Sequence, residues 1–109
     1  MARLTAGFWV AAYLARLRQA AIPAYVAARG DATAGSVVVK LATLDGRARA
    51  YERRYDLMAD SRRWEVLAEG CERAVDAALA RARARDPDLW LIEIEDRQGR
   101  TLLEEEGLS

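Results

Sequence analysis

The most basic stretch of the chain spans residues 47–54, which contain four arginines and one glutamate. The Asp45-Gly46 pair before it favours a two-residue hairpin turn, which would place Lys40 opposite Tyr51 and align the basic side chains on one sheet face. This basic strip consists of Lys40, Arg47, Arg49, Tyr51 and Arg53. The other face would carry Val37, Val39, Leu41, Ala48 and Ala50. Basic groups beside an aromatic ring suit single-stranded nucleic acid or a phosphorylated ligand.

The composition leaves a plainer interpretation of the strip open. Arginine supplies 16 of the 17 basic residues, so arginines on a solvated strand face are expected here even without a ligand. The 17 acidic residues balance the basic ones, and a formal net charge of zero argues against nucleic acid as the partner. The strip is therefore a candidate anion-binding surface, with an ordinary solvated sheet face as its alternative.

Acidic and nucleophilic side chains offer weaker candidates. Glu93 and Glu95 alternate along one predicted strand, so they share a face and could bind Mg²⁺ together with water. The sequence supplies no further ligands for such an ion, which favours a solvated strand face and no metal. The chain has no histidine, and its single cysteine, Cys71, has no neighbouring base or second cysteine. Histidine-dependent catalysis, zinc fingers and disulfide frameworks are therefore excluded.

A third candidate lies near the N-terminus. Trp9, Tyr13 and Arg16 recur at helical spacing within an unusually wide apolar arc. If this group is exposed, it could anchor an interface with another protein or with a second copy of the chain. The alternative is that the aromatic rings pack in the core of their own domain.

Hydrophobic periodicity predicts the elements that position these side chains. Helices are expected over residues 5–21 and 72–85, and strands over residues 23–29, 36–44, 47–58, 63–68, 89–95 and, briefly, 101–103. The order helix, four-strand meander, helix, strand indicates an α+β domain with two helices. The sheet is expected to be mixed but largely antiparallel, because the connection through the second helix could make the following strand parallel. Trp90, Ile92 and Ile94 alternate on that strand and are predicted to be buried.

The length fits one domain, residues 1–109, in which residues 104–109 form a frayed tail. Large apolar side chains are scarce, because 23 of the apolar residues are alanine. No apolar run reaches the roughly 18 residues that a membrane span needs, and no signal-peptide cleavage site follows the N-terminal apolar run. We expect a soluble, cytoplasmic protein that does not contact a membrane.

Several motifs carry a resemblance to a known family. They are Arg29-Gly-Asp31 with Gly35, Trp64, and above all Asp86-Pro-Asp-Leu-Trp90 followed by Ile92-Glu-Ile-Glu95. With these residues the chain resembles a short, mostly alphaproteobacterial family named domain of unknown function 1491, over nearly its whole length. The resemblance implies a bacterial protein and supports the predicted fold. It implies no activity.

The order of elements also resembles the core of restriction-endonuclease-like nucleases. Their sites need an acidic-x-lysine triplet, whereas the triplet here is Val38-Val39-Lys40, with valine where a metal-binding carboxylate is required. An active nuclease is therefore not expected. We predict no catalytic residue and no cofactor.

The sequence thus favours a non-enzymatic protein-interaction module. The alternative is binding of nucleic acid or a phosphate ligand through the basic strip. A degenerate nuclease-like protein or a metal-dependent hydrolase that uses Glu93 and Glu95 ranks third.

Overall fold

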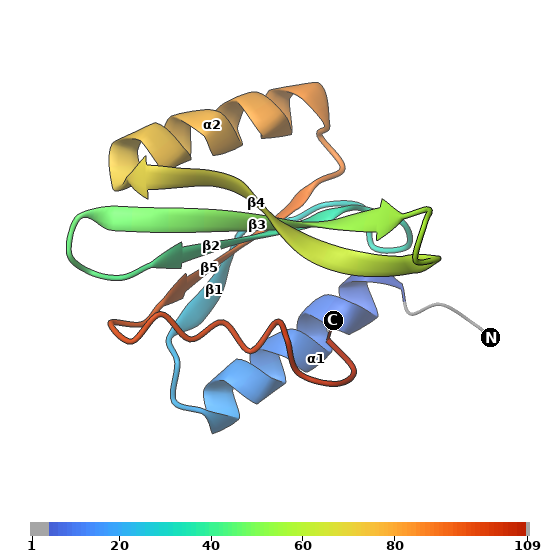
Figure 1. Cartoon of the computed structure of the whole chain (residues 1–109), viewed down its shortest axis with the longest axis horizontal. Coiled ribbons are helices and arrows are strands. Elements are labelled where there is room, and N and C mark those ends of the chain that lie inside the picture. Colours follow the sequence, from blue (N-terminus) through green and yellow to red (C-terminus); the bar gives the residue numbers. More distant parts are fainter. Residues whose placement is uncertain (1–4, 109) are drawn as a thin grey trace.

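The structure, a computed structural model, describes the backbone of residues 5–108 and their side chains except those of residues 55 and 56. Its elements follow in the order α1 (Ala6–Gln19), β1 (Ala24–Ala28), β2 (Val37–Ala42), β3 (Arg47–Asp56), β4 (Ser61–Cys71), α2 (Glu72–Arg85) and β5 (Trp90–Glu95). Figure 1 shows one sheet with α2 on one side and α1 on the other. The predicted α+β class with two helices is confirmed.

The five strands form one sheet in the order β1-β5-β2-β3-β4. β5 is parallel to β2, and the other neighbouring pairs are antiparallel, so the sheet is mixed and largely antiparallel as predicted. β5 lies between β1 and β2, so the antiparallel run of consecutive strands comprises β2, β3 and β4, and β1 joins the sheet through β5. Residues 101–103, predicted as a short strand, lie outside the sheet.

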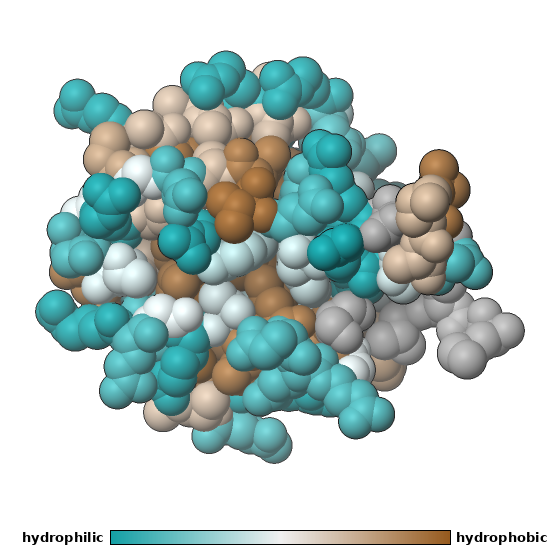
Figure 2. Space-filling model, in the orientation of Figure 1, coloured by the Kyte–Doolittle hydropathy of each residue, from teal (hydrophilic) through white to brown (hydrophobic). Residues whose placement is uncertain are grey.

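Each face of the sheet packs against one helix. On the α1 face, Trp9, Tyr13 and Leu17 pack against alternating residues of β2 and β5. On the α2 face, Val75 and Leu79 pack against Val38, Ala48 and Ala50. Trp90, Ile92 and Ile94 are at most 3% exposed, which confirms their predicted burial. The surface seen in Figure 2 is mostly hydrophilic, with small apolar patches between polar side chains.

The predicted register of the β2–β3 hairpin is wrong by one residue. Lys40 pairs with Ala50 rather than with Tyr51, because the Thr43 N–H donates to the Arg47 carbonyl and leaves a three-residue loop, residues 44–46, where a two-residue turn was predicted. Asp45 stabilises this loop by accepting hydrogen bonds from the Thr43 hydroxyl (2.6 Å) and the Arg47 backbone N–H (3.1 Å). A shift by one residue moves every side chain to the opposite face. Lys40 therefore lies on the α2 face.

The same shift places Arg47, Arg49 and Arg53 of β3 on the α1 face. There they share the face with Val37, Val39 and Leu41, whereas Ala48 and Ala50 pack against α2. The prediction had put these apolar residues together on the face opposite the arginines. The hairpin thus carries Lys40 on one face of the sheet and Arg47, Arg49 and Arg53 on the other.

The C-terminal segment crosses the α1 face as far as Leu108. The Leu108 side chain is 1% exposed, and the Trp64 indole N–H donates a hydrogen bond to the Leu108 carbonyl. Figure 1 shows this segment running beside α1. It therefore covers part of the face on which Arg47, Arg49 and Arg53 lie.

Within residues 5–108, neither helix is long and apolar enough to cross a membrane.

Candidate functional site

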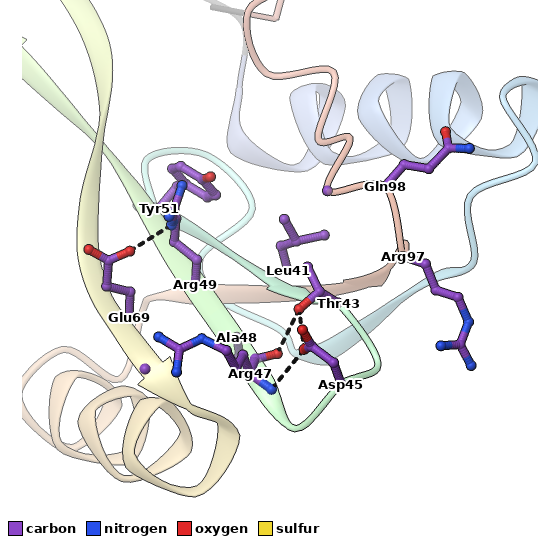
Figure 3. Close-up of a pocket in the computed structure, with 12 residues that line it drawn as sticks. Leu41, Thr43, Asp45, Arg47, Ala48, Arg49, Tyr51, Glu69, Arg97 and Gln98 are labelled. Atoms are coloured by element: carbon purple, nitrogen blue, oxygen red, sulfur yellow. Dashed lines mark hydrogen bonds and ion pairs between the residues drawn. The ribbon is translucent and has the colours of Figure 1, made fainter.

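A polar pocket of about 310 Å³ lies on the α1 face, at the hairpin end of β2 and β3. Three residues of the predicted strip line it, namely Arg47, Arg49 and Tyr51, and Leu41 lies at its base. Glu69 of β4 and Arg97 of the turn after β5 also line it. Figure 3 shows the β3 and β4 side chains at one side of this pocket and the Arg97 turn at the other. We call it the arginine pocket.

Arg49 is the most firmly held cation of the arginine pocket. Its Nε donates a hydrogen bond to Glu69 Oε2 at 2.9 Å, and the two residues face each other across β3 and β4. Hydrogen bonding with Tyr51 and the charge of Glu69 raise the pKa of the Arg49 guanidinium above its ordinary value. Both the Arg49 and Glu69 side chains are about half exposed, so this cation stays charged and within reach of a ligand.

Arg47 differs from Arg49, because no carboxylate holds its guanidinium among the residues that the structure describes. Asp45 is the acidic residue closest to Arg47 in sequence, but its carboxylate accepts hydrogen bonds within the loop instead. Hydrogen bonds from the Thr43 hydroxyl and the Arg47 backbone N–H lower the pKa of Asp45, so it remains ionised. The Arg47 side chain is exposed and free to turn toward a bound anion.

Arg97 lines the pocket from the facing turn and is also exposed. No ion pair involves its guanidinium within residues 5–108. In Figure 3 its side chain and that of Gln98 point away from Arg49, so Arg97 would reach a ligand only after a change of rotamer. We treat Arg47 and Arg49 as the main candidates and Arg97 as an accessory one.

Arg53, also predicted in the strip, lies outside the arginine pocket. Its guanidinium lies against both the Trp9 and the Trp64 ring, 5.0 and 5.2 Å from their centroids. Burial and the nearby charge of Arg62 lower the pKa of Arg53. The cation–π contacts give this half-buried cation a structural role in the α1 face.

Lys40, the remaining cation of the predicted strip, is buried on the α2 face. Its ammonium contacts Asp76 Oδ1 at 2.7 Å, Glu72 Oε2 at 2.8 Å and Glu93 Oε1 at 3.2 Å. Burial alone lowers the pKa of Lys40, but hydrogen bonds to these three carboxylates outweigh it and raise the pKa above its ordinary value. All three ammonium hydrogens have an acceptor, so Lys40 has no capacity left for a ligand.

Of the predicted interface residues of the first helix, Trp9 and Tyr13 face inward, and Arg16 is partly exposed. Trp9 is 3% and Tyr13 0% exposed, and their rings stack with centroids 4.9 Å apart. The Tyr13 hydroxyl donates a hydrogen bond to the Thr101 carbonyl, and burial raises the pKa of Tyr13. Arg16 donates to the Glu106 carbonyl at 2.8 Å. The apolar arc is wide because it covers both the sheet and the C-terminal segment.

The acidic candidates Glu93 and Glu95 do not form a metal site among the described residues. Glu93 and Glu95 lie on one face of β5, as predicted, but Glu93 is bound to Lys40. Among the described residues, no group of three or more acidic or cysteine side chains is arranged to hold a metal ion. Cys71 is an exposed free thiol at the start of α2.

The motif residues shared with the resembled family form a structural contact between two loops. The Asp31 backbone N–H donates to the Asp88 carbonyl at 2.9 Å, and the Trp90 indole N–H donates to the Asp31 carbonyl at 2.8 Å. A Cβ at Gly30 or Gly35 would collide with the Asp88 carbonyl oxygen. These glycines are required because the two loops approach so closely. The motif therefore stabilises the fold and lies outside the arginine pocket.

A model of the family described as protein of unknown function (DUF1491) matches residues 4–104. The chain belongs to this family. Among curated proteins, none shows significant similarity to it.

Solved structures of the DUF1491 family share the fold. The crystal structure of a family member from Caulobacter crescentus CB15 is 38% identical, covers 94% of each chain and has a TM-score of 0.81. An NMR structure of a family member from the same organism is 37% identical over 95% of this chain and 96% of that one, with a TM-score of 0.82. The solution structure of protein Atu0922 from A. tumefaciens is 31% identical over 86% of each chain, with a TM-score of 0.73.

Proposed function

We propose that this DUF1491 protein binds a small ligand that carries a phosphate group, and that the arginine pocket is the binding site. The observation that supports this proposal most strongly is the exposed Arg47 guanidinium beside Arg49, without a carboxylate partner among the described residues. An arginine provides planar, paired N–H donors that match the oxygens of a phosphate.

The spacing of the two arginines suits one anionic group. Arg47 and Arg49 are two residues apart on β3, so their side chains leave the same face about 7 Å apart along the strand. Two long side chains at this separation can converge on one phosphate from opposite sides. The volume of about 310 Å³ is that of a site for a small molecule. The Thr43 and Gln98 side chains in the lining could bind hydroxyl groups of the same ligand.

An extended nucleic acid strand fits this face less well. Such a strand would have to follow β3 from Arg47 to Arg53, but Arg53 packs against the Trp9 and Trp64 rings. The C-terminal segment lies across the same face, where Leu108 contacts Trp64. Only the hairpin end of the strip is open, which supports a ligand of limited size.

The proposal is tested by titrating the protein with methyl phosphate at low ionic strength, followed by calorimetry or by ¹H–¹⁵N correlation spectra. We expect saturable binding that shifts signals around the pocket and that Arg49→Ala weakens tenfold or more, because charge-assisted hydrogen bonds are worth about 1.5–3 kcal/mol. Arg54→Ala is the matched control, since Arg54 pairs with Glu52 outside the pocket. Absence of binding, or equal loss in both variants, would refute the proposal.

A labelled single-stranded oligonucleotide separates the two anion classes. We expect no binding beyond that of the single phosphate at its end. Binding that strengthens with oligonucleotide length and falls with salt by a log–log slope of roughly 0.7 per phosphate contact would instead identify nucleic acid as the ligand.

We further propose that the protein works in the cytoplasm. Its one thiol, Cys71, is exposed and free, which suits a reducing compartment.

A further inference from the structure

Glu69 is the acidic residue of the arginine pocket whose carboxylate contacts one of its cations, at Arg49 Nε. Asp45, the other acidic residue of the lining, is bound to Thr43 and the Arg47 backbone. The Glu69 carboxylate thus lies where an oxygen of a bound anion would contact Arg49. We infer that Glu69 is an internal competitor, which a phosphate-bearing ligand displaces from Arg49 on binding. This inference rests on the proposed function of the pocket.

The contact between Glu69 and Arg49 is one that a ligand can replace. Both side chains are about half exposed, and exposed ion pairs of this kind contribute little to stability. A carboxylate ligand would exchange one carboxylate for another at Arg49 and gain nothing there. A phosphate monoester carries three terminal oxygens and nearly two charges above pH 6, so it can contact Arg47 and Arg49 together.

The backbone around Glu69 also permits such a displacement. β4 is the edge strand of the sheet, and the pairing of β3 with β4 shifts register between Ala50 and Tyr51, opposite residues 66–68. On the other side of Glu69, Gly70 has φ +142°, a value that other residues rarely adopt. Glu69 thus stands between two irregular positions on an exposed edge, and no helix packs over its side chain in Figure 3. Its side chain can swing away while the hydrogen bonds of the strand stay in place.

A different role for Glu69 would give the opposite result on mutation. If the carboxylate served to orient Arg49 for the ligand, its removal would weaken binding, because positioned donors lose less entropy on binding. If it competes with the ligand, its removal strengthens binding. The sign of the change in affinity therefore separates the two roles.

The experiment measures the dissociation constants of methyl phosphate and acetate for the wild-type protein, Glu69→Gln and Glu65→Gln at pH 7.5. Glu65 lies on the same strand, and its Oε2 lies 3.9 Å from Arg54 Nε. Its substitution therefore removes the same charge outside the pocket lining. We expect Glu69→Gln to bind methyl phosphate about tenfold and acetate about threefold more tightly, since the dianion gains more from the loss of a negative charge. Glu65→Gln should change either affinity less than twofold.

The outcomes separate this inference from the proposed function. If wild type binds methyl phosphate and Glu69→Gln binds it equally or more weakly, the competitor role is overturned and the binding function stands. If only Glu69→Gln binds, the ligand does not displace Glu69 in the wild-type protein, so the proposed function and the competitor role both fail. If neither protein binds, the proposed function fails, and the competitor role fails with it.

Discussion

Lys40 and Arg49 lie on neighbouring strands of one hairpin, yet the two cations differ in burial and in the number of carboxylates that they contact. The Lys40 ammonium is 3% exposed and contacts three carboxylates on the α2 face. The Arg49 guanidinium is half exposed on the α1 face and contacts one carboxylate, with the unpaired Arg47 beside it. The number of acceptors per cation, rather than the number of cations in a stretch of sequence, therefore separates a structural charge from a candidate binding group.

The chemistry of the side chains matches these two environments. An ammonium is a compact charge with three hydrogens, which suits three separate carboxylates in a confined space. A guanidinium is planar and less strongly hydrated, which suits exposed recognition of an oxyanion. In a chain with 16 arginines, the one lysine stands at the position with three acceptors.

The largest expected effect is the loss of the buried ammonium. Lys40→Met keeps the length of the side chain but leaves Glu72, Asp76 and Glu93 without their shared counter-ion. We expect the free energy of unfolding to fall by about 3 kcal/mol, at the lower end for a broken buried ion pair because the carboxylates are partly exposed. Urea denaturation measures this change. Arg47→Met removes the same charge from the same hairpin and should cost less than about 0.5 kcal/mol. Equal losses of unfolding free energy in Lys40→Met and Arg47→Met would contradict the distinction between a structural Lys40 and an exposed Arg47.

A smaller effect is expected at Arg53. Arg53→Ala removes the cation that lies against the Trp9 and Trp64 rings and exposes part of both, which should cost about 1–2 kcal/mol. Because Arg53 lies outside the arginine pocket, the affinity for methyl phosphate should stay within twofold of wild type. Thermal unfolding and the same titration check the two halves of this prediction. Tenfold weaker binding at unchanged stability would place Arg53 in the binding site.

Exchange of one cation for the other should have an effect of similar or smaller size. Lys40→Arg retains the charge but introduces a larger, planar group into a closely packed space, and we expect a cost of about 1 kcal/mol, well below that of Lys40→Met. A comparison of the two denaturation midpoints tests this order. A loss as large as that of Lys40→Met would show that geometry rather than charge dominates at this position.

The smallest effect on stability is expected in the pocket itself. Arg49→Ala removes a half-exposed ion pair with Glu69 and should change the free energy of unfolding by less than about 0.5 kcal/mol. The same variant should lose most of its affinity for methyl phosphate. A large loss of stability would assign Arg49 a structural role like that of Lys40.

The sequence contained enough information for the elements but not for the pairing of the hairpin. The alternation of Trp90, Ile92 and Ile94 predicts a buried strand, because every second side chain of a strand points to the same face of the sheet. The register of β2 and β3 depends on two hydrogen bonds of the Asp45 carboxylate, which favour a three-residue loop over the two-residue turn that Asp45-Gly46 suggests. The one extra loop residue places Lys40 on the face opposite to the predicted one.

The candidate site was predictable in part. Arg47, Arg49 and Tyr51 alternate along one strand, so their common face follows from the sequence. Glu69 becomes visible only from the register of β3 with β4, and Arg97 only from the tertiary packing of the turn after β5. The burial of Trp9 was equally hidden, because the C-terminal segment that helps to cover the α1 face lies far away in sequence.

Side-chain NMR can distinguish a structural Lys40 from ligand-binding Arg47 and Arg49. Spectra of the Lys40 ammonium and of the arginine Nε–H groups are recorded while methyl phosphate is added at low ionic strength. We expect the Lys40 hydrogens to exchange slowly with solvent and not to shift, whereas the Nε–H signals of Arg47 and Arg49 shift together and saturate. A shift of the Lys40 signal, or arginine signals that stay in place up to saturating phosphate, would contradict the division of the cations into structural and binding groups.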